Sequence, residues 1–446
     1  MSSNPIDQIA TLITRAKAAG ADAADAIYVS RTAHGAQVRN GRTEDLERSE
    51  TCDLGLRVFV GQRAAIVSAT ALDPARFDAL AERAVAMARV VPEDRFAGLC
   101  AEAEHRFIDA AGLDLFDPTE PATGDLIARA RVAEESALAV EGVSNSNGAS
   151  ASFGLSDIIL MTSAGFSGRY ARTSHSVSVS TVAGSGTKME RDYDYHAAVH
   201  LSDLEDAALI GRRAGERTVA RLNPVRPRTG RMPIVLDPRV STSMLGHLSG
   251  AINGISIARG TSFLKEKMDS RIMPAGITII DDPRRVRGPG ARPFDGEGML
   301  TATRTLVEDG VLKTWALDSR SARQLGLKPN GCASRGTSGP PSPSLGNMYM
   351  QPGNMTPAEL LADITEGIYI TEMMGSAING ITGDYSRGAA GFMIRNGVLA
   401  EPVAELTVAG NLNDMFMRLV PANDLTFRQS TNAPTIRIDD MMIAGA

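Results

Sequence analysis

The amino-acid sequence predicts an α+β fold, in which duplicated α-β(n)-α units precede a C-terminal, strand-rich and mostly antiparallel domain. Its 446 residues are more than one hydrophobic core usually supports, so we expect two domains or one duplicated assembly. Hydrophobic residues make up 43% and charged residues 22% of the chain, as in ordinary globular proteins. The 43 glycines and only 4% aromatic residues favour many short strands joined by tight turns, around an aliphatic core.

The first predicted unit consists of a helix, several strands and a second helix. Apolar residues three and four positions apart predict an amphipathic helix near residues 5–19. Residues 26–71 are rich in β-branched side chains, and the turn signals Asn40-Gly41 and Gly61-Gln62 divide them into at least four predicted short strands. Asp73-Pro74 offers an N-cap and a first-turn proline, so we expect the second helix to begin there.

A second unit repeats this order. A helix is predicted to end near residue 140, and residues 143–201 are predicted to form strands. Turn signals within these strands stand at 147–148, 164–165 and 184–186. Ser202-Asp203 then caps a helix that reaches about Leu222. Because the order of helix, strands and helix occurs twice, it predicts an internal duplication within residues 1–222.

The expected domain boundary is the segment 223–233, which is dense in proline and arginine. It separates a first domain over residues 1–222 from a second over residues 234–446. The second domain opens with a buried strand at 234–236 and a helix near Asp237-Pro238 that is rich in serine and glycine. The small residues of this helix predict a close contact with another element.

The rest of the second domain is predicted to consist of strands and glycine-rich loops. A strand at 277–280 precedes a loop at 281–298 that is loaded with proline, glycine and arginine, and a hairpin turns at 308–310. Further strands follow one another from 391 to 445. Short connections between strands favour antiparallel pairing.

Composition excludes several classes of protein. Lys and Arg number 46 against 52 Asp and Glu, for a net charge of −6, so no cationic field attracts nucleic acid. The cysteines Cys52, Cys100 and Cys332 form no C-x-x-C pair, which argues against a disulfide framework and favours a reducing cytoplasm. The first residues lack a signal-peptide pattern, and no run of about 18 apolar residues predicts a membrane-spanning helix.

Three generic catalytic patterns are weak. His196 and His200 have the i, i+4 spacing of helical metal ligands, but the residues before them alternate as in a strand, which favours surface histidines. Ser167 lacks the second glycine of a G-x-S-x-G elbow, which disfavours serine hydrolysis. Cys332 lies in a segment rich in glycine and serine, where a free loop thiol is favoured over a nucleophile.

The order and spacing of five segments in the second domain resemble the TldD/PmbA family, also called the modulator of DNA gyrase family. These segments are residues 236–268, 294–298 (FDGEG), 303–326, 343–350 (PSLGNMYM) and 383–412. The layout of the first domain is compatible with that family, so the resemblance covers essentially the whole chain. It implies the fold of the family and one of its two branches.

The helix around His247 decides between the branches. In the TldD branch this helix carries H-E-x-x-x-H, a metal site completed by a cysteine near the C-terminus. Here Leu248 stands in place of the general base, Ile252 replaces the second histidine, and no cysteine follows Cys332. Neither leucine nor isoleucine offers a lone pair to zinc or to its water. The resemblance therefore implies the PmbA/TldE branch, with no catalytic or metal-binding residue in this chain and His247 as a remnant, packing residue or capping donor.

For that branch the resemblance implies a cytoplasmic subunit that pairs with a TldD-type chain. The pair acts as a metalloprotease on unfolded peptides, the zinc lies in the TldD-type partner, and no cofactor is expected in this chain. The alternative is a homodimeric binding or scaffold protein without protease activity. Nucleic acid and membranes are not expected partners in either case.

The loop at 281–298 is the candidate contact with substrate or partner. Its candidate residues are Arg285, Arg287, Arg292, Asp295 and Glu297. Arginine suits the recognition of carboxylates, and strand edges in the second domain can accept an extended peptide by β-addition. The alternative is a structural crossover in which the two acidic residues pair with the arginines of the same loop.

Overall fold

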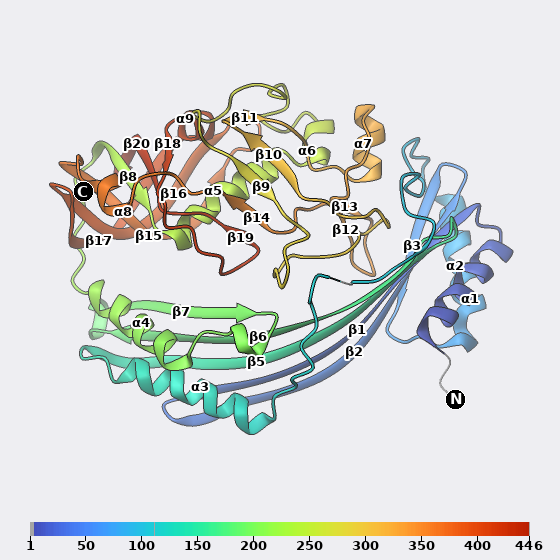
Figure 1. Ribbon diagram of the computed structural model, residues 1–446, viewed down its shortest axis with the longest axis horizontal. Helices are drawn as coiled ribbons and strands as arrows, with labels where there is room; N and C mark the ends of the chain where they lie inside the picture. The colour runs from blue at the N-terminus through green and yellow to red at the C-terminus, as the bar shows by residue number, and fades with distance from the viewer. Residues whose placement is uncertain (1–3, 111, 446) are drawn as a thin grey trace.

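The computed structural model describes residues 4–110 and 112–445, so residues 1–3 and 446, at the ends of the predicted domains, lie outside the described residues. The chain forms an elongated molecule in which the long, curved strands of the first domain run beneath the second domain (Figure 1). Helices and strands are mixed throughout, and the C-terminal part is rich in strands, which confirms the predicted α+β class.

Within the described residues, the first domain contains the order helix, three strands, helix twice. The first copy comprises α1 (Pro5–Ala18), β1 (Ala23–Arg39), β2 (Arg42–Val60), β3 (Arg63–Ala69) and α2 (Phe77–Val90). The second copy comprises α3 (Thr123–Leu138), β5 (Val143–Thr162), β6 (Ser167–Ala183), β7 (Glu190–Ala198) and α4 (Ala207–Ala220). The short β4 (Phe107–Ile108) lies between them in sequence.

Each copy supplies one half of a single sheet. The strands β3, β2 and β1 of the first copy and the strands β5, β6 and β7 of the second pair in that order, and β1 meets β5 in antiparallel register. The helix pairs α1–α2 and α3–α4 pack against different ends of this sheet (Figure 1). The layout is that of the predicted duplication.

The strands of the first domain are longer than the sequence predicted. The strands β1 and β2 are 17 and 19 residues long, so the prediction of at least four short strands over residues 26–71 is wrong.

The turns at Asn40-Gly41 and Gly61-Gln62 are confirmed, because β1 pairs with β2, and β2 with β3, directly across them. The turn predicted at Asn147-Gly148 is wrong: Gly148 has a φ of 110° inside β5, where the register shifts. A bulge accepts a residue with positive φ as readily as a hairpin turn does.

The second domain contains short helices among many strands. Its helices are α5 (Pro238–Ala251), α6 (Gly254–Ala258), α7 (Ser319–Leu325), α8 (Pro357–Leu361) and α9 (Leu412–Met417). Its strands are β8 (Gly230–Leu236), β9 (Ile279–Asp281), β10 (Arg304–Glu308), β11 (Val311–Leu312), β12 (Ala333–Ser334), β13 (Ser342–Pro343), β14 (Met348–Met350), β15 (Glu366–Ile378), β16 (Asp384–Arg395), β17 (Val398–Asn411), β18 (Leu419–Pro421), β19 (Thr431–Asn432) and β20 (Ile436–Ala444). The first of these strands begins inside the predicted boundary segment 223–233.

Two sheets of this domain enclose α5. The larger has the order β17-β16-β15-β8-β20-β18, and an additional pairing of β17 with β20 closes it on itself. The smaller has the order β11-β10-β9-β14-β19. Most neighbours are antiparallel, as predicted, and the parallel pairs β8–β15 and β14–β19 are exceptions. Met244, Leu245 and Leu248 of α5 share one hydrophobic core with residues of both sheets.

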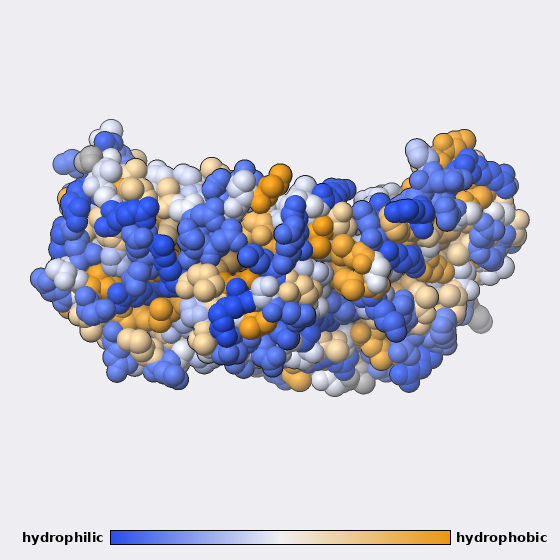
Figure 2. Space-filling view, turned by 90° about the horizontal axis from the view of Figure 1, so that it is seen from above, coloured by the Kyte–Doolittle hydropathy of each residue, from blue (hydrophilic) through white to orange (hydrophobic). Residues whose placement is uncertain are grey.

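The surface of the molecule is mixed in character. Figure 2 shows hydrophilic residues interspersed with smaller apolar patches when the molecule is seen from above. Across the described residues, none of the helices combines the length and the apolar character that a membrane span requires.

Candidate functional site

The helix α5 carries the segment that the sequence singled out. The side chain of Asp237 accepts a hydrogen bond of 2.9 Å from the backbone N–H of Arg239, which caps the helix ahead of Pro238. The close contact predicted from its small residues is confirmed only in part. Ser241 is buried against the backbone of the strand region near residue 433, whereas Gly246 and Gly250 face open space.

His247 lies half-buried on α5, with its ring edge-on to Tyr385 at 5.7 Å between centroids. Burial, and secondarily the charge of Arg387, lowers the pKa of His247 to about 4, so the imidazole is neutral at pH 7. Leu248 and Ile252 lie in the hydrophobic core with no exposed surface. The described residues contain no group of three or more His, Cys, Asp or Glu that could hold a metal ion. The residues at this helix therefore do not fit a zinc site.

A ladder of ion pairs joins β7 to α4 in the first domain. Asp192 and Asp194 are both buried on the same side of β7, because residues two apart on a strand share a face. Arg213 and Arg217 of α4 and its C-cap residue Arg221 are spaced four residues apart, which places them on one face. Arg213 and Arg217 approach Asp194 at 2.7 and 3.0 Å. Arg221 approaches Asp192 at 3.7 Å.

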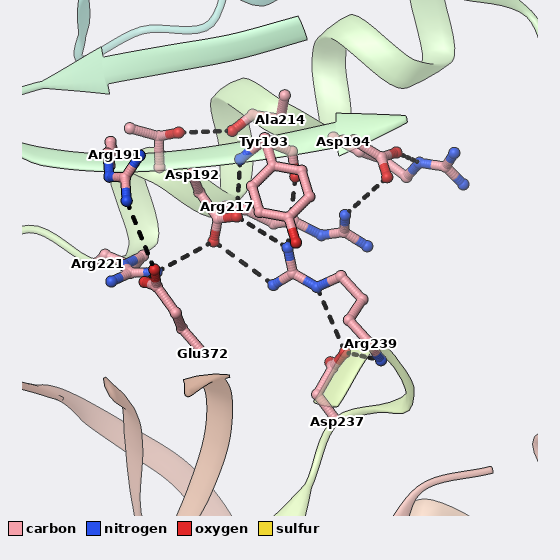
Figure 3. Close-up of polar contacts among 12 residues, drawn as sticks. Arg191, Asp192, Tyr193, Asp194, Ala214, Arg217, Arg221, Asp237, Arg239 and Glu372 are labelled. Carbon is pink, nitrogen blue, oxygen red and sulfur yellow. Dashed lines mark hydrogen bonds and ion pairs between the residues drawn. The ribbon is translucent and has the colours of Figure 1, made fainter. Parts of the chain in front are cut away.

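Asp192 also binds a residue of the second domain, Arg239, as Figure 3 shows. Arg239 Nη1 lies 2.8 Å from Asp192 Oδ1, and its Nε lies 3.4 Å from Asp237 Oδ1. Arg221 reaches across to Glu372 of β15 with 2.6 Å between Nη1 and Oε2. Charged groups buried at a junction contribute most when each has a partner, so this network fixes how β7 sits against α5 and β15.

Two cavities adjoin this network, and Arg239 lines both. The first has a volume of about 230 Å³ and is lined by Ser180, Arg191, Asp192, Tyr193, Arg221, Arg239, Val240, Ser243, Thr371, Glu372, Met373 and Arg387. The second, of about 190 Å³, is lined by residues that include Asp194, Tyr195, Arg217 and Arg428. We call the first of these the β7–β15 cavity. It lies beside the helix that carries His247.

The predicted contact residues of the loop at 281–298 lie apart from this cavity. Arg285 stacks on the ring of Phe427, with 3.4 Å between the guanidinium carbon and the ring centroid. Arg287 Nε lies 2.6 Å from Asp114, and its Nη1 lies 3.1 Å from Asp203, so it ties the loop to the first domain. The side chain of Arg292 donates to the backbone carbonyl of Ser344 at 2.7 Å.

Asp295 and Glu297 lie inside the molecule, at 2% and 3% exposure. Asp295 accepts hydrogen bonds from the backbone N–H groups of Glu297, Met299 and Ala333. Glu297 accepts from Ser319, at 2.7 Å from its N–H and 2.5 Å from its Oγ. Their burial leaves neither carboxylate on the surface where a partner could reach it, and neither forms a salt bridge with an arginine of this loop among the described residues.

Three weaker candidates are also placed. His196 lies on β7 and His200 lies beyond its end, so the two do not form one site. His196 is buried, not at the surface as predicted. Its Nδ1 accepts a hydrogen bond from the backbone N–H of Glu205 at 3.1 Å. Ser167 begins β6. Cys332 is a free thiol in the loop before β12, as predicted, but it is fully buried beside Arg304, and burial raises the pKa of its thiol to about 11. A thiol with that pKa is not a nucleophile at neutral pH.

Comparison with known proteins agrees with this architecture. Models of the PmbA/TldA metallopeptidase match in sequence order: domain 1 over residues 24–88, the central domain over 116–222 and the C-terminal domain over 229–445. Metalloprotease PmbA of Escherichia coli is 34% identical over 426 residues, which are 95% of this chain and 92% of the relative. The chain belongs to the PmbA/TldD family, on its PmbA branch. A metalloprotease PmbA homolog of Haemophilus influenzae is 31% identical over 90% of this chain and 88% of its own length.

Solved structures share the fold over the whole chain. A proposed modulator of DNA gyrase from Bacteroides thetaiotaomicron superimposes with a TM-score of 0.90 at 26% identity, covering 99% of this chain and 98% of that one. TldE from Thermococcus kodakarensis superimposes with a TM-score of 0.85 at 18% identity, covering 98% and 100% of the two chains. The second likeness is one of fold alone.

Sequence reasoning missed the residues that build the β7–β15 cavity. Asp192, Arg239 and Arg387 were not among the candidates, although two signals were present. Alternating charged and aromatic residues at 191–195 marked a strand with two different faces, and the arginines of α4 recur every four residues. What the sequence could not give was the packing of α5 against that strand.

Proposed function

We propose that this chain is the PmbA/TldE-type subunit of a heteromeric metalloprotease that cleaves unfolded peptides, with the zinc held by a TldD-type partner. The observation that carries the proposal is the lack of a zinc-ligand set on α5. His247 remains, but Leu248 and Ile252 are packed in the core. A zinc peptidase needs several ligands and a carboxylate to activate water, and this helix offers neither. A cytoplasmic location belongs to the same proposal.

The edge of β15 supports a peptide as the substrate of the pair. The strand β8 pairs with β15 only through Ile368, Tyr369 and Ile370. From Thr371 onward, none of the described strands pairs with that side of β15. A free strand edge accepts an extended chain through main-chain hydrogen bonds, with little demand on side-chain identity. Such recognition suits unfolded peptides.

Co-expression with a TldD-type chain that carries H-E-x-x-x-H tests the proposal. We expect a tag on the partner to retain this chain, the complex to contain zinc, and cleavage of an unfolded peptide to be faster than by either chain alone. A partner with alanine at both motif histidines is the control that should assemble without zinc. If this chain forms only homodimers and leaves the activity of the partner unchanged, the proposal is wrong and a scaffold protein is favoured.

Among the loop residues, Arg285 is the one proposed to reach the partner. It is partly exposed, and Val286 beside it is 58% exposed. Arg285→Ala removes the guanidinium without breaking a salt bridge between described residues, whereas Arg287→Ala breaks two. We expect Arg285→Ala to weaken binding of the TldD-type chain several-fold at low salt, measured by light scattering. The exposed Arg284→Ala is the matched control, and equal binding by both variants would contradict the contact.

A further inference from the structure

The β7–β15 cavity has an excess of positive charge. Four arginines line it, Arg191, Arg221, Arg239 and Arg387, against the carboxylates of Asp192 and Glu372. Both carboxylates already have partners. Asp192 binds Arg239 at 2.8 Å, and Glu372 binds Arg221 at 2.6 Å.

Two of the arginines keep charge that no carboxylate neutralises closely. Arg387 donates from Nε to the backbone carbonyl of Gly375 at 2.9 Å and from Nη2 to that of Met373 at 3.4 Å. None of the described carboxylates forms a salt bridge with it. Arg191 is 72% exposed and approaches Glu372 only at 4.0 Å. A guanidinium held by neutral carbonyls at the wall of a cavity favours an anion there.

Hydroxyl groups in the same wall lack partners. Ser243 of α5 and Thr371 of β15 both line the cavity. Their side-chain oxygens are buried, and neither has a hydrogen-bond partner among the described residues. The Nε2 of His247, one helical turn beyond Ser243, is also buried and has no hydrogen-bond partner among the described residues. Buried polar atoms without partners cost stability, so a ligand that accepts hydrogen bonds from the hydroxyls would recover that cost.

We propose that the β7–β15 cavity binds a carboxylate group of a peptide chain, held by Arg387 and Arg191 with hydrogen bonds from Ser243 and Thr371. A carboxylate matches the planar fork of an arginine and accepts several hydrogen bonds. Asp192 and Glu372 in the wall repel a doubly charged anion more strongly than a singly charged one. The carboxylate belongs to the C-terminus of the peptide or to an acidic side chain.

The edge of β15 explains why the carboxylate belongs to a peptide. Thr371, the first residue of β15 past the end of the β8 ladder, also lines the cavity. A chain extended along that edge therefore reaches the cavity with one of its ends or side chains. The inference rests on the proposed function only in taking a peptide as the carrier, since the site lies wholly within this chain.

Calorimetric titration of the purified full chain, without any partner, tests the site. The probes are one acetylated peptide of alternating alanine and serine in three forms: with a free C-terminal carboxylate, with a C-terminal amide, and as the amide with aspartate in the last position. We expect the free acid or the aspartate form to bind at least tenfold more tightly than the plain amide, and the better of the two identifies the source of the carboxylate. Equal affinities of all three forms would overturn the proposal, as would tighter binding of inorganic phosphate than of either acid form.

Variants place the binding in the cavity. Arg387→Ala is expected to weaken the acid-specific binding at least tenfold. Thr371→Val and Ser243→Ala, which keep the shape of the wall, are expected to weaken it two- to fivefold each. Arg395→Ala is the matched control on the same strand, where Arg395 pairs with Glu366 and Glu401 outside the cavity. If the Thr371 and Ser243 variants fold and bind as the parent does, the assignment is wrong. Because no partner is present, failure of heteromer assembly leaves these results unaffected.

Discussion

The guanidinium of Arg239, in the first turn of α5, binds the carboxylate of Asp192 on β7, with 2.8 Å between Nη1 and Oδ1. The side chain of Asp192 is 3% exposed and that of Arg239 is 18% exposed. Arg239 belongs to the second domain, and Asp192 belongs to the sheet of the first domain. This pair therefore sets the width of the β7–β15 cavity, in which both residues form part of the wall.

Removing Arg239 is expected to destabilise the chain. Arg239→Ala leaves Asp192 buried with Arg221 at 3.7 Å as its nearest remaining cation. Breaking a buried pair by removing one partner usually costs about 3–5 kcal/mol, and the remaining arginine reduces this to about 2–4 kcal/mol. Urea unfolding measures the change. Arg226→Ala, at an exposed pair with Glu405, is the control, and an equal effect of the two variants would contradict the importance of the junction.

Zinc binding by the isolated chain is expected to be far below one ion per molecule. His247 is neutral, but one imidazole without a second protein ligand binds zinc weakly. Elemental analysis after dialysis against zinc decides the question. His247→Ala serves as the comparison, since a stoichiometric ion lost in that variant would show that α5 still forms a metal site.

The pH dependence of stability is expected to contain a contribution from Glu297. Burial raises the pKa of Glu297 from 4.5 to about 7 in the folded chain. The charge of Arg57 opposes this rise, and the charge of Asp295 adds to it. Between those two values the folded state holds more protons than the unfolded state, so the free energy of unfolding falls as pH rises from about 4.5 to 7. The loss amounts to at most about 3 kcal/mol.

Comparison of the parent with Glu297→Gln isolates this contribution. Glutamine does not titrate, so the difference in unfolding free energy between the two proteins should change across that pH range and level off above it. Urea unfolding at pH 4.5, 5.5, 6.5 and 7.5 measures the difference. The exposed Glu82→Gln is a control that should give a constant difference. A constant difference for Glu297→Gln as well would show that this carboxylate is not desolvated.

Local signals in the sequence predicted the types of element well and their lengths poorly. The residue types at Asn40-Gly41 and Asp237-Pro238 by themselves favour a tight turn and a helix N-terminus, so the hairpin and the start of α5 were predictable. The lengths of β1 and β2 depend on pairing with strands far away in sequence, which propensity does not contain. Cys332 shows the same limit, because its burial is decided by the second domain packing around a glycine-rich segment. The site itself needed contacts between β7, α5 and β15, and no local pattern specifies those.

Arg287 is expected to hold the loop at 281–298 against the first domain. Its backbone N–H donates to the carbonyl of Leu113 at 2.9 Å, while its side chain binds Asp114 and Asp203. In Arg287→Ala both carboxylates lose this partner, and alanine must still adopt the left-handed φ of 54° found at this position. We therefore expect faster amide hydrogen exchange at residues 113–117 and 201–204, with the exposed Arg284→Ala as the matched control. Unchanged exchange in the Arg287 variant would mean that backbone contacts alone hold the loop in place.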